Sequence, residues 1–118
     1  MPWFLTKEAL VSGSVVARLE QEAWRDDAPG IRARECFDMD GKRFAIVEYG
    51  PGAARDDWCV VGHYGFVVSG RIRYRFEDGS PALEAGAGEA FFLSTAPAHQ
   101  GGNIAAEGPT TLFLIDPV

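Results

Sequence analysis

From Ile31 onward the chain consists of short apolar runs that glycine and proline interrupt at nearly regular intervals. Its 118 residues include 14 glycines and 7 prolines. Runs of this length suit β-strands, and no helical period separates them, which argues against a parallel sheet with crossover helices. We therefore expect an all-β chain folded as a small antiparallel barrel or sandwich.

The turn and strand signals alternate along this part of the chain. Residues 39–42 read Met-Asp-Gly-Lys, an Asp-Gly hairpin signal, because both central residues of a type I′ turn need positive φ. A strand over Arg43–Tyr49 follows. In Arg71–Phe76, apolar residues alternate with arginines, which predicts one buried face and one solvated or ion-paired face. Ala90–Leu93 and Thr111–Ile115 are the later predicted strands.

The first 30 residues follow a different pattern. Ser14 is a candidate N-cap for a short helix whose apolar positions would be Val15, Val16, Leu19, Ala23 and Trp24. We expect residues 1–30 to form a helical or irregular arm that packs on a barrel of residues 31–118. Trp24 and the arm are also candidates for packing across a partner subunit.

Charge and segment composition limit the partners and the location. Acidic residues outnumber basic ones 17 to 11, giving a net charge of −6, which disfavours nucleic acid and anionic membranes. No run approaches the ~18 apolar residues of a membrane span, and no basic segment followed by an apolar run opens the sequence. We expect a soluble cytoplasmic protein in which Cys36 and Cys59 are reduced.

Gly88, His99 and Asn103 are spaced as in a known short motif. That motif runs Gly, five residues, Pro-x-Gly, two residues, His, three residues, Asn, and it is the second motif of the cupins, a family of small conserved β-barrels. Here Ser94 replaces its proline and Ala96 its inner glycine. Over roughly residues 43 to 116 the chain resembles a single-domain cupin, which implies a double-stranded β-helix, or jelly roll.

The first cupin motif is degenerate in this sequence. It runs Gly, five residues, His-x-His, three or four residues, Glu, six residues, Gly. Gly70 matches the closing glycine, His63 stands in place of the glutamate, and no His-x-His pair precedes it. Counting back three residues from His63 puts Asp57 and Cys59 at the pair, and counting back four puts Asp56 and Trp58 there. Both registers remain open.

The resemblance implies that Asp57, Cys59, His63 and His99 face one cavity, where the family binds a divalent metal. A thiolate, two imidazoles and a carboxylate suit zinc or iron and disfavour magnesium or calcium. Residues 57, 59 and 63 are separated by even numbers, so a regular strand would place them on one face, unless Gly62 marks a bulge. The alternative is a buried thiol and hydrogen-bonded core histidines without metal.

Cupins span several classes of function, so the resemblance leaves alternatives open. One is a metal-dependent enzyme, such as an oxygenase or isomerase, acting on a small organic molecule. Another is a non-catalytic module that binds or senses a small molecule without metal, and a third is a structural dimer. The resemblance implies a homodimer. Glu48 and Tyr74 are the other titratable candidates, and Gln100–Gly102 is predicted to be a flexible rim.

Overall fold

We describe the protein from a computed structural model, in which residues 7–9, 13–37 and 39–117 are described. The regular secondary structure of the described residues is almost entirely β, and their strands pair antiparallel throughout. The strands are β1 (Lys7–Ala9), β2 (Val15–Ala17), β3 (Arg25–Ala28), β4 (Ile31–Cys36), β5 (Lys42–Tyr49), β6 (His63–Ser69), β7 (Arg71–Phe76), β8 (Leu83–Gly86), β9 (Ala90–Leu93), β10 (His99–Asn103) and β11 (Thr110–Pro117). The expected all-β fold is confirmed.

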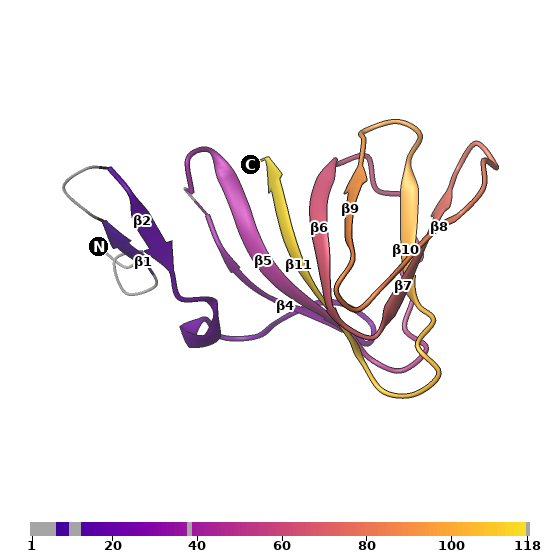
Figure 1. Cartoon of the computed structure of the whole chain (residues 1–118), viewed down its shortest axis with the longest axis horizontal. Helices are drawn as coiled ribbons and strands as arrows, with labels where there is room; N and C mark the ends of the chain where they lie inside the picture. The colour runs from indigo at the N-terminus through magenta and orange to yellow at the C-terminus, as the bar shows by residue number, and fades with distance from the viewer. Residues whose placement is uncertain (1–6, 10–12, 38, 118) are drawn as a thin grey trace.

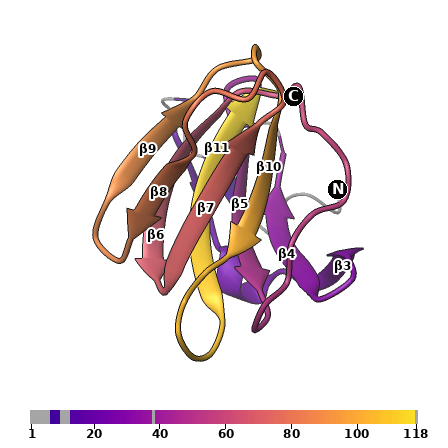
Figure 2. The ribbon, with the colours of Figure 1, turned by 90° about the vertical axis from the view of Figure 1, so that its right-hand side faces the viewer.

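Two sheets form the body of the molecule (Figure 1). One has six strands in the order β3-β4-β5-β11-β6-β9, and the other has three in the order β10-β7-β8. Figure 2 shows β10, β7 and β8 in front of β5, β11 and β6. The C-terminal strand β11 lies between β5 and β6 and pairs with both, so residues far apart in the sequence become neighbours on one face.

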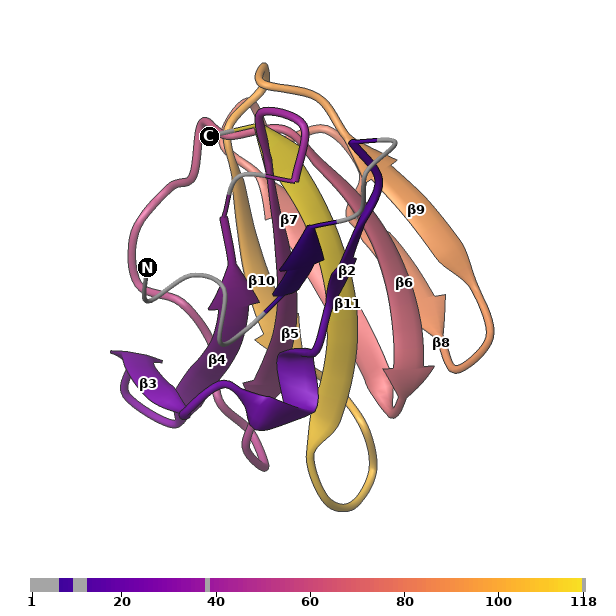
Figure 3. The same cartoon turned by 90° about the vertical axis from the view of Figure 1, so that its left-hand side faces the viewer.

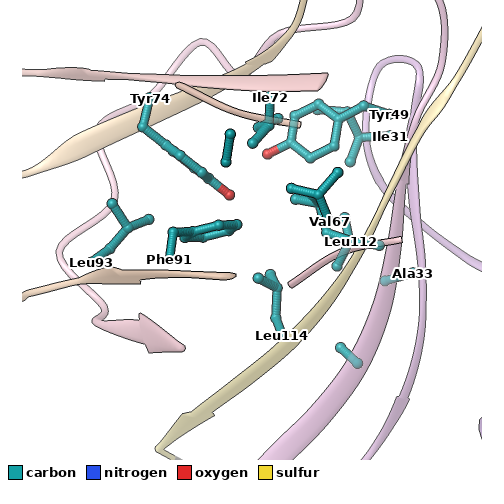
Figure 4. Packing of buried hydrophobic residues seen from close by; sticks show 13 residues of the cluster. Ile31, Ala33, Tyr49, Val67, Ile72, Tyr74, Phe91, Leu93, Leu112 and Leu114 are labelled. Carbon is teal, nitrogen blue, oxygen red and sulfur yellow. The ribbon is translucent and has the colours of Figure 1, made fainter. Parts of the chain in front are cut away.

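The core lies between the two sheets. Strands β7 and β11 each bury alternate residues, as expected for strands with one face toward an apolar interior. Figure 4 shows this packing, in which Ile72 of β7 and Leu112 of β11 are fully buried. On the other face of β7, Arg71 and Arg73 pair with Glu84, so the predicted ion-paired face is confirmed.

The Asp-Gly hairpin is confirmed between β4 and β5. Asp40 and Gly41 have φ values of 59° and 73°, and the Met39 amide donates to the Lys42 carbonyl at 3.2 Å. Positive φ at both central positions is the signature of the type I′ turn, so local chemistry alone sets the register of this hairpin.

The helix predicted over residues 14–24 is wrong in extent. Val15–Ala17 forms β2, which pairs with β1, and only Leu19–Gln21 is helical, as a single 3₁₀ turn, η2. Figure 3 shows this segment in front of β5 and β11. No residue of η2 is buried, so no apolar face stabilises a longer helix, and β-branched valines favour the strand. Trp24 lies outside η2, with the guanidinium of Arg32 at 4.1 Å from its ring centroid.

The rim predicted at Gln100–Gly102 is instead the middle of strand β10, paired with β7. Gln100 is buried, and its amide donates to the Asp56 carbonyl at 2.7 Å. Glycines read as flexible from sequence because they lack a Cβ. Here that missing Cβ makes room for side chains, since a Cβ on Gly101 would stand 2.7 Å from Tyr49 Oη.

Candidate metal centre

Cys59 and His99 are held opposite each other by a short backbone bridge. The Cys59 amide donates to the His99 carbonyl at 2.8 Å, and the His99 amide donates to the Cys59 carbonyl at 3.0 Å. Directly opposed residues of an antiparallel pair project their side chains to the same side. The bridge therefore places the thiol beside the imidazole at the start of β10.

His63, the first residue of β6, completes a cluster of three candidate ligands. Its Nε2 atom lies 3.8 Å from Cys59 Sγ, and its ring centroid lies 5.3 Å from that of His99. The ligand atoms of Cys59, His63 and His99 all lie within 4.8 Å of one another. The structure thus brings together three of the four residues named from the sequence.

Cys59 and His63 do not come together by sharing one face of a strand, as their even spacing predicted. Cys59 lies in an isolated bridge to His99, and the regular strand begins only at His63. Between them, Gly62 passes close to β9, where a Cβ would stand 2.9 Å from the Leu93 carbonyl oxygen. Residues 57, 59 and 63 therefore do not share one regular strand, and tertiary pairing brings Cys59 and His63 together.

Asp57 and the residues of the alternative register, Asp56 and Trp58, lie outside the cluster of three ligands. Asp57 and Trp58 are exposed and line the same cavity, but neither belongs to the group of three. Asp56 is exposed as well, and its backbone carbonyl accepts the Gln100 amide. Of the two registers, the one with Cys59 is the one whose side chain reaches the histidines.

Asp116 on β11 is a site residue that the sequence analysis missed. The register pairs Asp116 with Arg43 and Ile115 with Tyr64, which places Asp116 beside His63. Its Oδ2 lies 2.9 Å from His63 Nδ1 and accepts from Arg43 Nη1 at 3.2 Å. Asp116 occupies an inward position at the end of the apolar alternation of β11, and that buried carboxylate was the available signal.

The Asp116 contact orients His63 toward the thiol. A carboxylate at Nδ1 favours a proton on that nitrogen, so Nε2 is the atom that faces Cys59 and would bind a metal ion once it has lost its own proton. The same arrangement is common behind metal-binding histidines, where a carboxylate fixes the ring and raises its basicity. The outer partner of this imidazole is therefore in place.

Electrostatics favour the thiolate at Cys59. Its interaction with His63, and then with His99, lowers the pKa of Cys59 to about 5, although burial opposes the shift. Burial alone would lower the pKa of His63, but hydrogen bonds with Asp116 and Cys59 outweigh it and raise this pKa. A thiolate is the form of cysteine that binds metals.

His99 gives a direct test of whether a metal fits. It is 2% exposed, and neither ring nitrogen has a hydrogen-bond partner among the described residues. A buried unpartnered nitrogen costs free energy unless a ligand satisfies it. A tetrahedral zinc ion would hold sulfur and nitrogen ligands about 3.6 Å apart, close to the 3.8 Å between Cys59 Sγ and His63 Nε2. The donor set therefore fits a zinc or iron ion.

The cluster opens into a cavity of about 490 Å³. Aliphatic side chains such as Val47, Val61 and Leu114 line part of it, and Tyr49 and Tyr74 contribute to its wall. A continuous chain of polar contacts also runs along the wall to His63, through Arg55, Asp27, Arg25, Glu35, Arg43 and Asp116. The volume suits a small organic molecule.

Glu48 and Tyr74, the other titratable candidates, lie in different places: Glu48 outside the cavity and Tyr74 in its wall. Glu48 forms an ion pair with Arg32 at 2.8 Å and does not line the cavity. Tyr74 is 3% exposed and contacts the edge of the His99 ring, with centroids 5.6 Å apart. Burial raises its pKa well above the usual range. Neither Cys36 nor Cys59 forms a disulfide bond with another described residue.

Comparison with solved structures identifies the architecture. The chain resembles KdgF from Halomonas sp. at 19% identity, with a TM-score of 0.65 over 84% of this chain and 89% of that one. It resembles an RmlC-like cupin from Shewanella frigidimarina at 18% identity, with a TM-score of 0.64 over 84% and 86% of the two chains. A sugar phosphate isomerase of the cupin superfamily from Silicibacter pomeroyi matches at 16% identity, with a TM-score of 0.65 over 85% and 73%.

Sequence comparison adds no further relative. No family model matches the chain, and a search of curated proteins finds no match. No helix among the described residues is long and apolar enough to cross a membrane. The chain therefore has the same β fold as these solved cupin structures.

Proposed function

We propose that the protein binds one divalent metal ion, zinc or iron, through Cys59, His63 and His99, and acts on a small organic molecule in the adjoining cavity. The observation that carries this proposal is the convergence of three unlike donors. Cys59 favours the thiolate, His63 presents Nε2, and buried His99 has no other partner among the described residues. Three protein ligands beside a cavity are typical of catalytic rather than structural metal sites.

The bound metal would supply Lewis acidity toward a substrate oxygen atom. The residues of the chain would supply the rest. Asp116 holds His63 in one tautomer and orientation, and the aliphatic wall around Val47 and Leu114 limits the access of water. Asp57, the fourth ligand that the resemblance implied, lines the same cavity but lies outside the group of three, and a variant tests whether it binds the metal.

Elemental analysis of protein purified without chelators tests the proposal. We expect about one equivalent of zinc or iron per chain, lost in Cys59→Ser and in His99→Ala. Cys36→Ser is the matched control, because Cys36 is a buried cysteine outside the cluster. Absence of metal after reconstitution under reducing conditions would refute the ligand assignment, and equal loss in all three variants would indicate misfolding.

The variant Asp57→Asn tests whether Asp57 is the fourth ligand of the metal ion. A loss of metal affinity of more than tenfold would assign Asp57 as a ligand. Unchanged affinity would leave that position to water or substrate. We expect the metal affinity of Asp57→Asn to fall by less than about tenfold, because the exposed carboxylate of Asp57 lies outside the group of three.

A second candidate function rests on a different reading of the same geometry. Cys59, His63 and Asp116 have the order of nucleophile, base and orienting carboxylate, with successive contacts of 3.8 and 2.9 Å. A thiol-dependent hydrolase would turn over an activated ester such as p-nitrophenyl acetate in the presence of a chelator. Turnover beyond one equivalent that disappears in Cys59→Ser and Asp116→Asn would favour this candidate over the metal site.

The remaining expectations stay proposals. We propose a cytoplasmic homodimer with an arm of residues 1–30 packed on a barrel of residues 31–118; residues 1–6 and 10–12 of this arm lie outside the described residues, and its last strand, β3, pairs with β4 of the barrel. The outer face of β6 and β9 supports a dimer, because Tyr64, Phe66, Val68 and Phe92 are exposed there. Sedimentation equilibrium of the wild type and of Phe92→Glu tests it: a dimer that dissociates in the variant supports the interface, and a monomeric wild type refutes it. The non-catalytic binding module remains the alternative if no metal is found.

A further inference from the structure

The hydroxyl group of Tyr74 has no hydrogen-bond partner in the described part of the chain, although the residue is 3% exposed and lines the cavity. Figure 4 shows the hydroxyls of Tyr74 and Tyr49 directed into the same space. Unlike the ring nitrogens of His99, this hydroxyl is not sealed from solvent, so it opens onto the cavity and is free to donate to a ligand atom there.

Tyr49 and Arg55 bring further donors to this space. Tyr49 Oη accepts from Arg55 Nε at 3.0 Å, so the phenolic proton of Tyr49 remains free to donate, and no described residue accepts it. The Nη2 atom of Arg55 donates to Asp27 at 2.6 Å, and its Nη1 has no acceptor among the described residues. Three groups therefore offer unused N–H or O–H donors beside the cavity.

Gly101 permits this arrangement. A Cβ on Gly101 would stand 2.7 Å from Tyr49 Oη and 2.8 Å from Tyr74 Cε1, so both rings crowd the same point of β10. His99 is two residues earlier on that strand, and its ring is in edge contact with Tyr74. The donors thus lie next to the proposed metal centre.

The unused donors, rather than a net charge of the site, define the complementary ligand. A divalent ion held by one thiolate and two neutral imidazoles retains one positive charge if Asp57 is not a ligand. In the cavity wall, the cations Arg25, Arg43 and Arg55 balance the anions Asp27, Glu35 and Asp116, and Asp57, which also lines the cavity, offsets the remaining charge of the centre whether or not it is a ligand. The unused donors therefore define the ligand, because the two acceptor oxygens of a carboxylate form charge-assisted hydrogen bonds with them.

We propose, resting on the proposed metal function, that the substrate is a small monocarboxylate whose carboxylate accepts hydrogen bonds from Tyr49, Tyr74 and Arg55. Its other end then faces Cys59, His63 and His99. The aliphatic part of the wall, from Val47 to Leu114, would contact the carbon atoms between them.

Titration of the cobalt(II)-substituted protein with pyruvate and with the neutral analogue pyruvamide tests this substrate class. Visible absorption of cobalt and calorimetry report binding without any turnover. We expect pyruvate to bind at least about tenfold more tightly than pyruvamide, because its charge strengthens each hydrogen bond. Equal affinity of the wild type for the two compounds would overturn the proposal.

Variants assign the selectivity to named residues. Tyr74→Phe and Arg55→Gln should each weaken pyruvate about tenfold and leave pyruvamide nearly unchanged, with cobalt per chain unaltered. Arg73→Gln is the control, because Arg73 pairs with Glu84 on the outer face of β7. If Tyr74→Phe and Arg55→Gln both kept the wild-type preference for pyruvate over pyruvamide, the assignment of this selectivity to Tyr74 and Arg55 would be overturned.

The outcome also separates the two proposals. If the wild type takes up no cobalt but still prefers pyruvate in calorimetry, and Arg55→Gln loses that preference, the carboxylate site stands and the metal proposal fails. If the protein binds cobalt but binds pyruvate no more tightly than pyruvamide, the metal centre stands and the proposed substrate class is wrong. Thermal unfolding checks folding, and Tyr74→Phe should not lower the melting temperature, because it removes only an unpartnered hydroxyl.

Discussion

His63 Nδ1 lies 2.9 Å from Asp116 Oδ2, although 53 residues separate them in the sequence. Asp116 is 5% exposed and also receives the Arg43 guanidinium. The contact directs the other ring nitrogen of His63 at Cys59. A pairing of β-strands therefore prepares the imidazole for ligation before any ligand arrives.

Asp116→Asn should weaken metal binding about tenfold to a hundredfold, because an amide fixes the His63 tautomer poorly and removes negative charge behind the ring. Competition with a chromophoric zinc chelator measures the affinity. Asp78→Asn is a control, since Asp78 contacts only Ser80 in an exposed turn. An unchanged zinc affinity in Asp116→Asn would show that this carboxylate has no role in ligation.

The metal-free protein should react with iodoacetamide at Cys59 under acidic conditions. The pKa of Cys59 is lowered to about 5 from an ordinary 9.0, first by His63 and then by His99. The thiolate therefore predominates above pH 5, and the alkylation rate should fall only below that pH. Mass spectrometry of the Cys36→Ser protein, in which Cys59 is the one remaining thiol, measures the profile.

His63→Ala should move this alkylation profile toward the ordinary cysteine range and slow the reaction at pH 6 by more than about tenfold. A wild-type midpoint near that of an ordinary thiol would contradict the assigned environment of Cys59. An unchanged profile in His63→Ala would contradict the role given to His63.

Glu35→Gln should destabilise the protein at neutral pH by about 1–3 kcal/mol, because Glu35 bridges Arg25 and Arg43 in a half-buried position. Burial alone would raise the pKa of Glu35, but its two arginine partners outweigh burial and lower it. The stabilisation is therefore complete above the unfolded-state pKa of about 4.5 and is lost as the pH falls through the lower folded-state value.

Urea unfolding at pH 7 and at pH 3 measures this effect, and the difference between Glu35→Gln and the wild type should shrink at the lower pH. Glu84→Gln is the matched control, because Glu84 pairs with Arg71 and Arg73 on an exposed face, where screening by water leaves little net stabilisation. Equal effects of the two variants would mean that burial adds nothing to the Glu35 bridge.

Gly101→Ala should destabilise the protein by about 1–3 kcal/mol through overpacking, because the added Cβ would meet Tyr49 Oη and Tyr74 Cε1 at less than 3 Å. Gly102→Ala is a matched control on the same strand, since its Cβ would meet Ala54 Cβ at 3.4 Å. Thermal or urea unfolding of both variants checks the difference. If both variants were equally stable, the two tyrosines would have room to move.

The fold followed largely from local signals in the sequence. Asp40 and Gly41 set a hairpin, and the alternation in Arg71–Phe76 set a strand with one buried face, because both effects act within a few residues. The predicted helix over residues 14–24 was wrong because its periodicity had no buried face to contact. Gly101 and Gly102 suggested a flexible segment. The structure shows instead that Gly101 leaves room for the side chain of Tyr49, which the sequence could not reveal.

The sequence by itself determined the all-β class, most turns and the residue types of the candidate site, including Cys59, His63 and His99. Only the tertiary structure decided that Asp116 orients His63, because β11 inserts between β5 and β6 and joins residues with no local relation. It likewise decided that the Tyr74 hydroxyl faces a cavity and has no hydrogen-bond partner among the described residues. Local patterns fix backbone geometry, whereas contacts between side chains depend on strand order and register.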